Sequence, residues 1–466
     1  MKKIAGSVLT LAAVLSLTAV GCSKKSGSSS ASAGKGDGAY AEVQKEKDPA
    51  TKKLYDFGGM EVIVGDWWSN PDREPGSKQE EDTMAFRNWL GETYNFKAIQ
   101  SDCAGWGEHP KFVSNFCVTG GDENYVFIID GRSANSGVKA NLFYDLSKIK
   151  NIDWTKPKWD QGAIAKLKKG NSFYCFSYGK PEPKNGMFFN KRILQENGFD
   201  PDLPYDLQKE GKWTWETFED MCKKLTKDTD NDGVVDQYAM SSFNTEFSYA
   251  ALDSNGGSII GRDANGNYFN NAGSEKSMEA WNWIQHMFAT YQLPQGEGAS
   301  WDYFYTAFIN GETAFLADQE YNAQPNGRLS AMKDDWGFVC FPLGPSGDGK
   351  YHTLHDTNMW VLPSVYDEAR ANKIMKIVDF YTDDVPGYDG PDAWKDGYYA
   401  GFRDSRAVDE TLQLMMDTPN PRFDSLISGL NQGDMIWGVC GGYQTPQEAY
   451  ESCKNSWQSL IDDCNK

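Results

Sequence analysis

The loop from Asp228 to Asp236 carries a dense group of side chains that could bind a metal ion. It reads Asp-Thr-Asp-Asn-Asp-Gly-Val-Val-Asp, with carboxylates at alternate positions around a glycine turn. This spacing is typical of calcium loops, because alternate oxygen ligands and a sharp turn can surround one hard cation. The pattern predicts a structural Ca²⁺ held by four carboxylates and one backbone carbonyl: Asp228, Asp230, Asp232, Val234 and Asp236.

One feature of an EF-hand is missing from this loop. The position that usually supplies a bidentate glutamate, the twelfth of the motif, is Ala239. A bound ion would therefore need another oxygen or a water molecule. The alternative is a polar turn that binds no metal. We favour calcium, because the crowded carboxylates would otherwise repel one another.

The segment before this loop must position it. The apolar run 187–189 predicts a short buried strand. Thr214 is a good N-cap for a following helix, with Trp213 and Phe218 placed as a hydrophobic staple. One face of that helix should seek a core, because its apolar residues recur at helical spacing: Phe218, Met221, Cys222 and Leu225.

These residues resemble a known family, the extracellular solute-binding proteins that deliver sugars to ABC transporters. The resemblance covers about residues 58–466 and rests on five stretches: 187–191, 213–218, 224–228, 307–315 and 445–449. It implies an α/β fold of the periplasmic-binding-protein-like type II. In that fold two lobes, joined by three crossover segments, close over a ligand.

The N-terminus has the features of an exported lipoprotein. Met1-Lys2-Lys3 and the mainly apolar run 4–20 resemble a secretory signal, and the sequence Ala-Val-Gly-Cys that ends at Cys22 resembles a lipobox. We therefore expect residues 1–22 to be a signal peptide and Cys22 to be lipidated; the alternative is an ordinary export signal. Residues 23–57 follow as a flexible tether, since a Ser-, Gly- and Lys-rich stretch cannot offset its ordering entropy.

The remainder of the chain is too long for one ordinary domain. The resemblance divides it into an N-terminal lobe, residues 58–168 plus 353–404, and a C-terminal lobe, residues 169–352 plus 405–466. It places the crossovers near residues 170–174, 351–360 and 401–403.

The net charge and the aromatic content of the chain indicate which kinds of molecule it can bind. The chain has 66 Asp and Glu against 46 Lys and Arg, a net charge of −20, which opposes binding to nucleic acid or to anionic membrane surfaces. A neutral ligand is therefore favoured. Aromatic residues make up 14% of the chain and 16 of them are Trp, so we expect some to line a cleft. The nine cysteines lack the spacing of a zinc or redox site, and no disulfide is predicted.

The first predicted strand, residues 60–65, runs directly into Asp66, Trp67 and Trp68. Ligands of open α/β sheets bind beyond the carboxyl ends of the strands. We therefore expect Asp66 to meet sugar hydroxyls and a tryptophan to stack on a sugar face. Alternate residues of an extended segment point to opposite faces, so one of the two tryptophans should bind ligand and the other should pack in the core.

The strand 125–129 ends in the same way, with Asp130 and Arg132 as ligand candidates. A helix cap is the alternative role for Asp130. The resemblance adds further candidates from the crossovers and from the loop after residues 307–315, and these are Tyr174, Tyr178, Gln319, Tyr321, His355, Asp356 and Arg403.

The expected function is the capture of a mono- or oligosaccharide, which a membrane permease then receives from this lipid-anchored monomer on the outer face of the cytoplasmic membrane. No HExxH, GxSxG or Walker motif is present, so the sequence offers no sign of catalysis. The alternative is a lipid-anchored, glycan-active hydrolase, because an acidic chain can always supply a pair of carboxylates.

Overall fold

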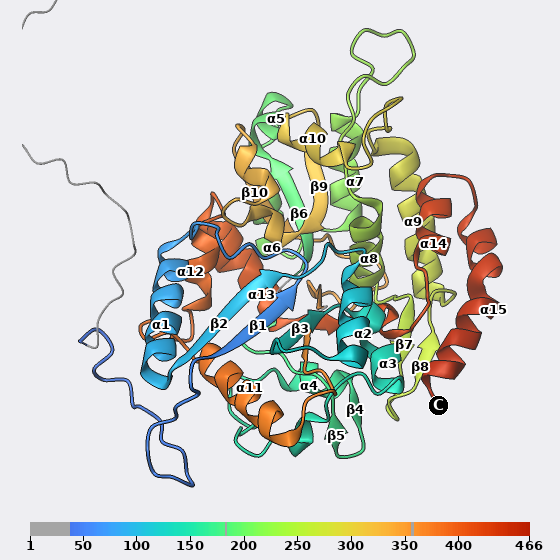
Figure 1. Cartoon of the computed structure of the whole chain (residues 1–466). Coiled ribbons are helices and arrows are strands. Elements are labelled where there is room, and N and C mark those ends of the chain that lie inside the picture. The colour runs from blue at the N-terminus through green and yellow to red at the C-terminus, as the bar shows by residue number, and fades with distance from the viewer. Residues whose placement is uncertain (1–37, 182–183, 356–357) are drawn as a thin grey trace, which may run out of the picture.

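The computed structural model describes residues 38–181, 184–355 and 358–466. Figure 1 shows two groups of elements, each built around its own sheet, with the second group above the first. Two hydrophobic cores match these groups. The arrangement confirms the predicted α/β class with two lobes. The predicted signal peptide and the lipidation site Cys22 lie outside the described residues.

The first lobe contains a four-stranded sheet with the order β12-β3-β1-β2. Strands β1, β2 and β3 are parallel, as is usual where helices connect successive strands of one sheet, and β12 runs antiparallel to β3. The sheet and the helices that connect it comprise β1 (Met60–Asp66), α1 (Lys78–Tyr94), β2 (Phe96–Asp102), α2 (His109–Thr119), β3 (Tyr125–Ile129), α3 (Gly131–Lys139), β12 (Met359–Val361) and α11 (Glu368–Tyr381).

Helix α1 is capped at its N-terminus by Ser77. The Ser77 hydroxyl accepts a hydrogen bond from the Glu80 N–H at 3.1 Å. The Glu80 carboxylate does not complete a capping box with Ser77, because it accepts from the Gly76 N–H and from Arg73 instead. The Arg73 guanidinium outcompetes the Ser77 amide because a charged donor makes the stronger hydrogen bond.

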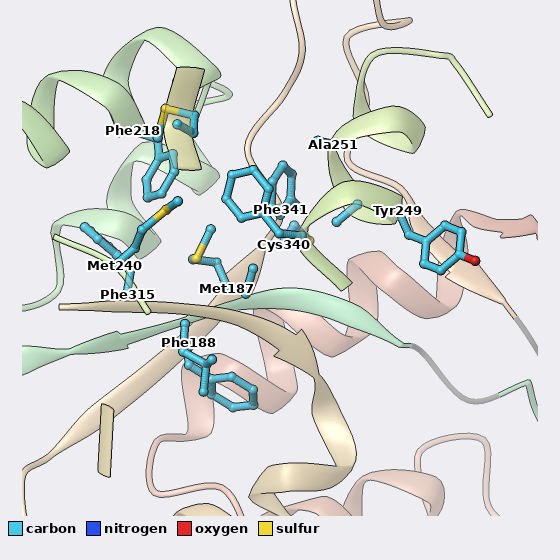
Figure 2. Close-up of a cluster of buried hydrophobic side chains, with 14 of the residues drawn as sticks. Met187, Phe188, Phe218, Met240, Tyr249, Ala251, Phe315, Cys340 and Phe341 are labelled. Carbon is cyan, nitrogen blue, oxygen red and sulfur yellow. The ribbon is translucent and has the colours of Figure 1, made fainter. Parts of the chain in front are cut away.

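The second lobe contains a three-stranded antiparallel sheet with β6 (Asn185–Asn190) between β10 (Trp336–Cys340) and β9 (Phe315–Gln319). Every residue of β6 is buried. Figure 2 shows Met187 and Phe188 on opposite sides of this strand, as the period of two requires. Both faces of the sheet are therefore covered.

The helices beside this sheet follow the predicted pattern. Thr214 caps α7 (Trp215–Leu225), and the rings of Trp213 and Phe218 lie 5.6 Å apart. Phe218, Met221, Cys222 and Leu225 are buried in the second core. Helices α8 (Asn244–Ser254) and α9 (Glu275–Tyr291) complete this layer.

Further elements join and flank the lobes. They include α4 (Gln161–Lys166), β4 (Lys168–Lys169), β5 (Ser172–Phe173), α5 (Lys191–Glu196), α6 (Leu203–Lys209), β7 (Ile260–Arg262), β8 (Tyr268–Asn270), α10 (Tyr303–Ile309), η2 (Glu320–Ala323), η3 (Arg328–Ala331), β11 (Thr353–His355), α12 (Trp394–Tyr399), α13 (Gln413–Asp417), β13 (Pro419–Pro421), η5 (Asp424–Leu426), α14 (Gly433–Cys440) and α15 (Pro446–Cys464). None of the helices in the described ranges is both long enough and apolar enough to cross a membrane.

The main chain changes core between Phe176 and Met187, between Tyr351 and Met359, and between Tyr381 and Phe402. The first of these passages begins later than the predicted crossover at 170–174. The reason is the β4–β5 hairpin, which keeps Phe173 in the first core. In addition, Leu426 in the C-terminal part packs in the first core, so η5 returns to the first lobe and contacts α3.

The predicted tether at 23–57 is too long. Tyr40 is only 5% exposed, and its ring lies 5.2 Å from Phe86 and 5.1 Å from Trp89. The Glu46 carboxylate forms an ion pair with Lys376 at 2.7 Å. Residues 38–57 therefore belong to the first lobe, because their few aromatic side chains bury enough apolar surface to offset the ordering entropy.

Candidate ligand-binding cleft

A cleft of about 840 Å³ lies between residues of the two lobes. Its volume falls within the range of small-ligand sites, roughly 300–1,000 Å³. Its first wall comes from the loop after β1, from α1 and from β2, and its second wall comes from η2, the loop that follows it and α12. The principal side chains are Trp68, Arg73, Met84, Arg87, Gln100, Tyr321, Pro325, Asn326 and Tyr398.

Asp66, at the carboxyl end of β1, shapes the first wall from beneath. Its carboxylate is fully buried and accepts hydrogen bonds from the N–H groups of Trp68 at 2.9 Å and Ser69 at 2.8 Å. The Gln100 amide donates to it at 2.9 Å. The prediction that Asp66 meets sugar hydroxyls does not fit this geometry, since its oxygens are engaged by the loop that it organises.

The adjacent tryptophans differ in exposure, but neither of them packs in a core, as the prediction required of one. Trp68 is 51% exposed and lines the cleft, whereas Trp67 is partly buried and packs 5.1 Å from the ring of His109. The two indoles meet edge to face at 4.7 Å. Burial lowers the pKa of His109, so a neutral imidazole supports Trp67. Trp68 is thus the indole available to a ligand.

The second wall presents Tyr321, which is 43% exposed. Burial, and then the neighbouring Asp318 carboxylate, raise the pKa of Tyr321 to about 12, so the phenol stays protonated at neutral pH. Asp318 itself is 1% exposed, and burial followed by the charge of Glu246 raises its pKa to about 7. Gln319 lies behind this wall, since its side chain bonds to Glu246.

Arg87 reaches the cleft from α1, and it was not among the predicted site residues. Its Nε donates to the Tyr381 carbonyl at 3.1 Å, and its Nη1 and Nη2 donate to the hydroxyls of Tyr381 and Tyr178 at 2.9 and 3.2 Å. The guanidinium also stacks 3.7 Å from the centre of the Tyr381 ring. One signal in the sequence was available: no acidic residue stands three or four positions from Arg87 on α1, where a surface arginine commonly finds a partner.

Asp130 and Arg132 lie at the carboxyl end of β3, beside β1, but they do not line this cleft. Asp130 is the N-cap of α3 and accepts from the Arg132 N–H at 3.0 Å, so the alternative role of helix cap is the one that the structure shows. The Arg132 guanidinium pairs with the same carboxylate and stacks 3.7 Å from the ring of Trp106.

Comparison with known proteins identifies the family. A model of the bacterial extracellular solute-binding proteins matches residues 121–385, which is more than half of the chain. The chain belongs to this family. A comparison with curated proteins found no match. As its family works outside the cytoplasmic membrane, this solute-binding protein is extracellular or periplasmic.

Solved structures of solute-binding proteins share the fold. The substrate-binding protein Lmo0181 from Listeria monocytogenes, in complex with cycloalternan, is 16% identical with a TM-score of 0.58, covering 87% of this chain and 98% of its own. UgpB from Mycobacterium tuberculosis, with glycerophosphocholine, is 14% identical with a TM-score of 0.61, covering 86% and 98%. The cyclic alpha-maltosyl-1,6-maltose binding protein from Arthrobacter globiformis is 12% identical with a TM-score of 0.60, covering 87% and 100%.

The residues predicted at the crossovers of this solute-binding protein take other positions. Tyr178 accepts from Arg87 and packs on Trp360 at 5.4 Å, and Tyr174 is partly buried against the first core. His355 is 9% exposed within β11, which pairs with β13, and Asp356 lies outside the described residues. Arg403 donates to the carbonyls of Met332 and Asp334, and thereby holds the turn before β10. Of the predicted ligand residues that the structure describes, Trp68 and Tyr321 are the two that line the cleft.

The acidic loop follows α7 in the second lobe. Carboxylate oxygens of Asp228, Asp230 and Asp236 lie within 4.8 Å of one another, and Gly233 takes the left-handed turn with φ of 90°. Asp232 is not part of this group, and its carboxylate accepts a hydrogen bond from the Val234 N–H. Three converging carboxylates at a turn suit a hard cation, so the residues fit the predicted ion with a smaller ligand set.

Proposed function

We propose that this solute-binding protein captures a carbohydrate between its lobes and delivers it unchanged to an ABC-transporter permease. The observation that carries the proposal is the pair of exposed aromatic side chains, Trp68 and Tyr321, on opposite walls of one cleft. Pyranose rings have apolar faces and hydroxylated rims, so a sugar site needs flat aromatic rings beside hydrogen-bonding groups. Gln100 and Asn326 supply amides in the same cleft.

The ligands of two structural neighbours support the choice of carbohydrate. Lmo0181 was solved with cycloalternan, and the Arthrobacter protein is described as binding cyclic alpha-maltosyl-1,6-maltose. Cys22 would anchor the protein through lipid to the outer face of the cytoplasmic membrane, and the Asp228–Asp236 loop would hold Ca²⁺ as a structural ion away from the cleft. The protein would act as a monomer and would carry out no covalent chemistry.

The test is a panel of mono- and oligosaccharides scored by the melting temperature of the protein. A ligand at about a hundredfold above its Kd should stabilise the folded state by roughly 2.7 kcal/mol. Each hit is then incubated with the protein and recovered for mass spectrometry. Intact recovery supports a binding protein, whereas cleavage supports the alternative of a glycan-active hydrolase. A panel without any hit, alongside a clear shift with peptides, contradicts the carbohydrate proposal.

A further inference from the structure

Arg87 is a cation in the cleft wall whose contacts are all with neutral groups. Its hydrogen bonds go to one backbone carbonyl and two phenol hydroxyls. Within the described residues it forms no ion pair with a carboxylate. A guanidinium has five N–H groups, and three of them make these bonds. The two nitrogens at the end of the side chain, Nη1 and Nη2, therefore each keep one N–H for another acceptor.

Arg73 provides the contrast within the same cleft. Its Nη2 lies 3.0 Å from both carboxylate oxygens of Glu80, so its charge is balanced by a partner. Asp66 is not a carboxylate partner that balances the charge of Arg87. It belongs to the same network, because Gln100 contacts both Asp66 and Tyr381, but its oxygens are engaged by Ser69 and by the loop N–H groups. Among the described residues of the first wall, Arg87 is the cation that has no carboxylate partner.

The surroundings hold the Arg87 guanidinium in a fixed orientation. Tyr381 contacts it through the ring face, the hydroxyl and the carbonyl, and Tyr178 fixes one end. Removing a cation from water is costly unless it gains a partner of opposite charge. A guanidinium that is already oriented loses little entropy when it binds a carboxylate, which can accept two parallel N–H bonds from the fork.

We propose that Arg87 binds a carboxylate of the ligand, and that the transported carbohydrate is acidic, with at least one uronic acid residue. The inference rests on the proposed function and names the substrate class of the same cleft. It replaces the neutral ligand that net charge alone favoured. The carboxylate would meet Arg87 while Trp68, from the same wall, stacks on a sugar ring.

The first test compares matched sugars by calorimetry with the wild-type protein. The probes are α-1,4-linked trigalacturonic acid, α-1,4-galactotriose and, as a second source of anionic charge, glucose 6-phosphate. Trigalacturonic acid should bind at least about tenfold more tightly than galactotriose, since a charge-assisted pair is about twice as strong as a neutral hydrogen bond. Equal or tighter binding of the neutral trimer overturns the proposal and leaves the proposed function standing. Binding of the sugar phosphate alone overturns the carboxylate assignment, and binding of no sugar in the wider panel contradicts the proposed function itself.

The second test uses variants. Arg87→Met should abolish the preference for the acidic trimer, Arg87→Lys should retain part of it, and Lys209→Met, an exposed lysine on α6, should retain all of it. Circular dichroism and melting curves check that each variant folds. If Arg87→Met does not fold, Arg87→Lys keeps the charge but loses the fork, and its acidic-to-neutral affinity ratio decides the question. A folded Arg87 variant with the full wild-type preference contradicts the proposal.

Discussion

The carboxylate of Asp66 accepts a hydrogen bond from the backbone N–H of Trp68 at 2.9 Å. A buried acid at the end of β1 therefore orients the exposed indole of the cleft. Asp66→Ala should cost roughly 1–3 kcal/mol of unfolding free energy, because buried N–H groups lose their acceptor. Sugar affinity should fall as well. Urea denaturation and calorimetry measure the two effects, and Asp102→Ala, at the end of the neighbouring strand, is the control. A stable variant with unchanged affinity would show that Asp66 does not organise the site.

Alanine variants of Trp68 and Trp67 should differ, the first losing sugar affinity and the second losing stability. Trp68→Ala should lose roughly 1–3 kcal/mol of sugar affinity, by analogy with stacking on other ring ligands. Its unliganded melting temperature should stay close to wild type because half of the side chain is exposed. Trp67→Ala should instead lower the melting temperature, since it removes packing against His109. If Trp68→Ala retains full affinity, the ligand does not occupy this cleft.

Asp379 is the centre of a buried network of charges. It is 2% exposed and pairs with Lys158 at 2.7 Å and with Lys376 at 2.8 Å. Asp379→Ala should destabilise the first lobe by roughly 3–5 kcal/mol, because two lysines lose a buried partner. Asp383→Ala is the matched control, since Asp383 contacts Lys158 at 2.6 Å but is 39% exposed. Chemical denaturation should rank the two losses in that order, and equal small losses would contradict the argument.

The raised pKa of Asp318 predicts that the free energy of unfolding falls as the pH rises. Its pKa is raised to about 7 in the folded protein, against about 3.9 in an unfolded chain. The folded state thus holds this proton more tightly. The resulting stabilisation is complete below about pH 4 and is lost as the pH rises to about 7. In Asp318→Asn, the loss of unfolding free energy between about pH 4 and pH 7 should be smaller by on the order of 2 kcal/mol. The figure is less than the full effect of the raised pKa, because the neighbouring Glu246 titrates together with Asp318.

Unfolding free energies measured between pH 4 and pH 8 test the Asp318 prediction. Asp263→Asn is the control, because hydrogen bonds, that from Asn267 first, lower the pKa of Asp263 and give it the opposite sign. Identical pH slopes in wild type and Asp318→Asn would rule out the assignment.

Calcium should stabilise the second lobe without taking part in ligand binding. Chelation with EDTA should lower the melting temperature, and Asp230→Asn should weaken Ca²⁺ uptake measured by calorimetry, because Asp230 is one of the three converging carboxylates. Asp263→Asn, in the turn from Asp263 to Asn267, should leave uptake unchanged. Sugar affinity of the folded protein should change little. A melting curve that does not respond to EDTA would exclude a structural calcium.

Local features of the fold could be predicted from the sequence. The Thr214 cap and the buried strand at 187–189 depend on residues a few positions apart, and the structure confirms them. The assignment of these elements to two lobes came from the resemblance to a family, because periodicity alone predicts single helices and strands and does not show how they are grouped.

Much of the cleft could not be predicted, because its parts meet only after the chain has folded. Arg87 gains its environment from Tyr381 and Tyr178, which lie on distant segments. Gln100 becomes a site residue through Asp66 on the neighbouring strand. The predicted role of Asp66 failed for a similar reason, since a carboxylate after a strand has the same local sequence whether it faces a ligand or supports the loop beneath it.

The packing of residues 38–57 on the first lobe fixes which half of the molecule carries the N-terminus. Tyr40 packs against Phe86 and Trp89, and Glu46 pairs with Lys376 on α11. Gly38, where the described chain begins, therefore belongs to the first lobe. For a protein held at a surface by its N-terminal end, the first lobe would be the one that the attachment reaches, and the second lobe would be connected to the surface only through the first.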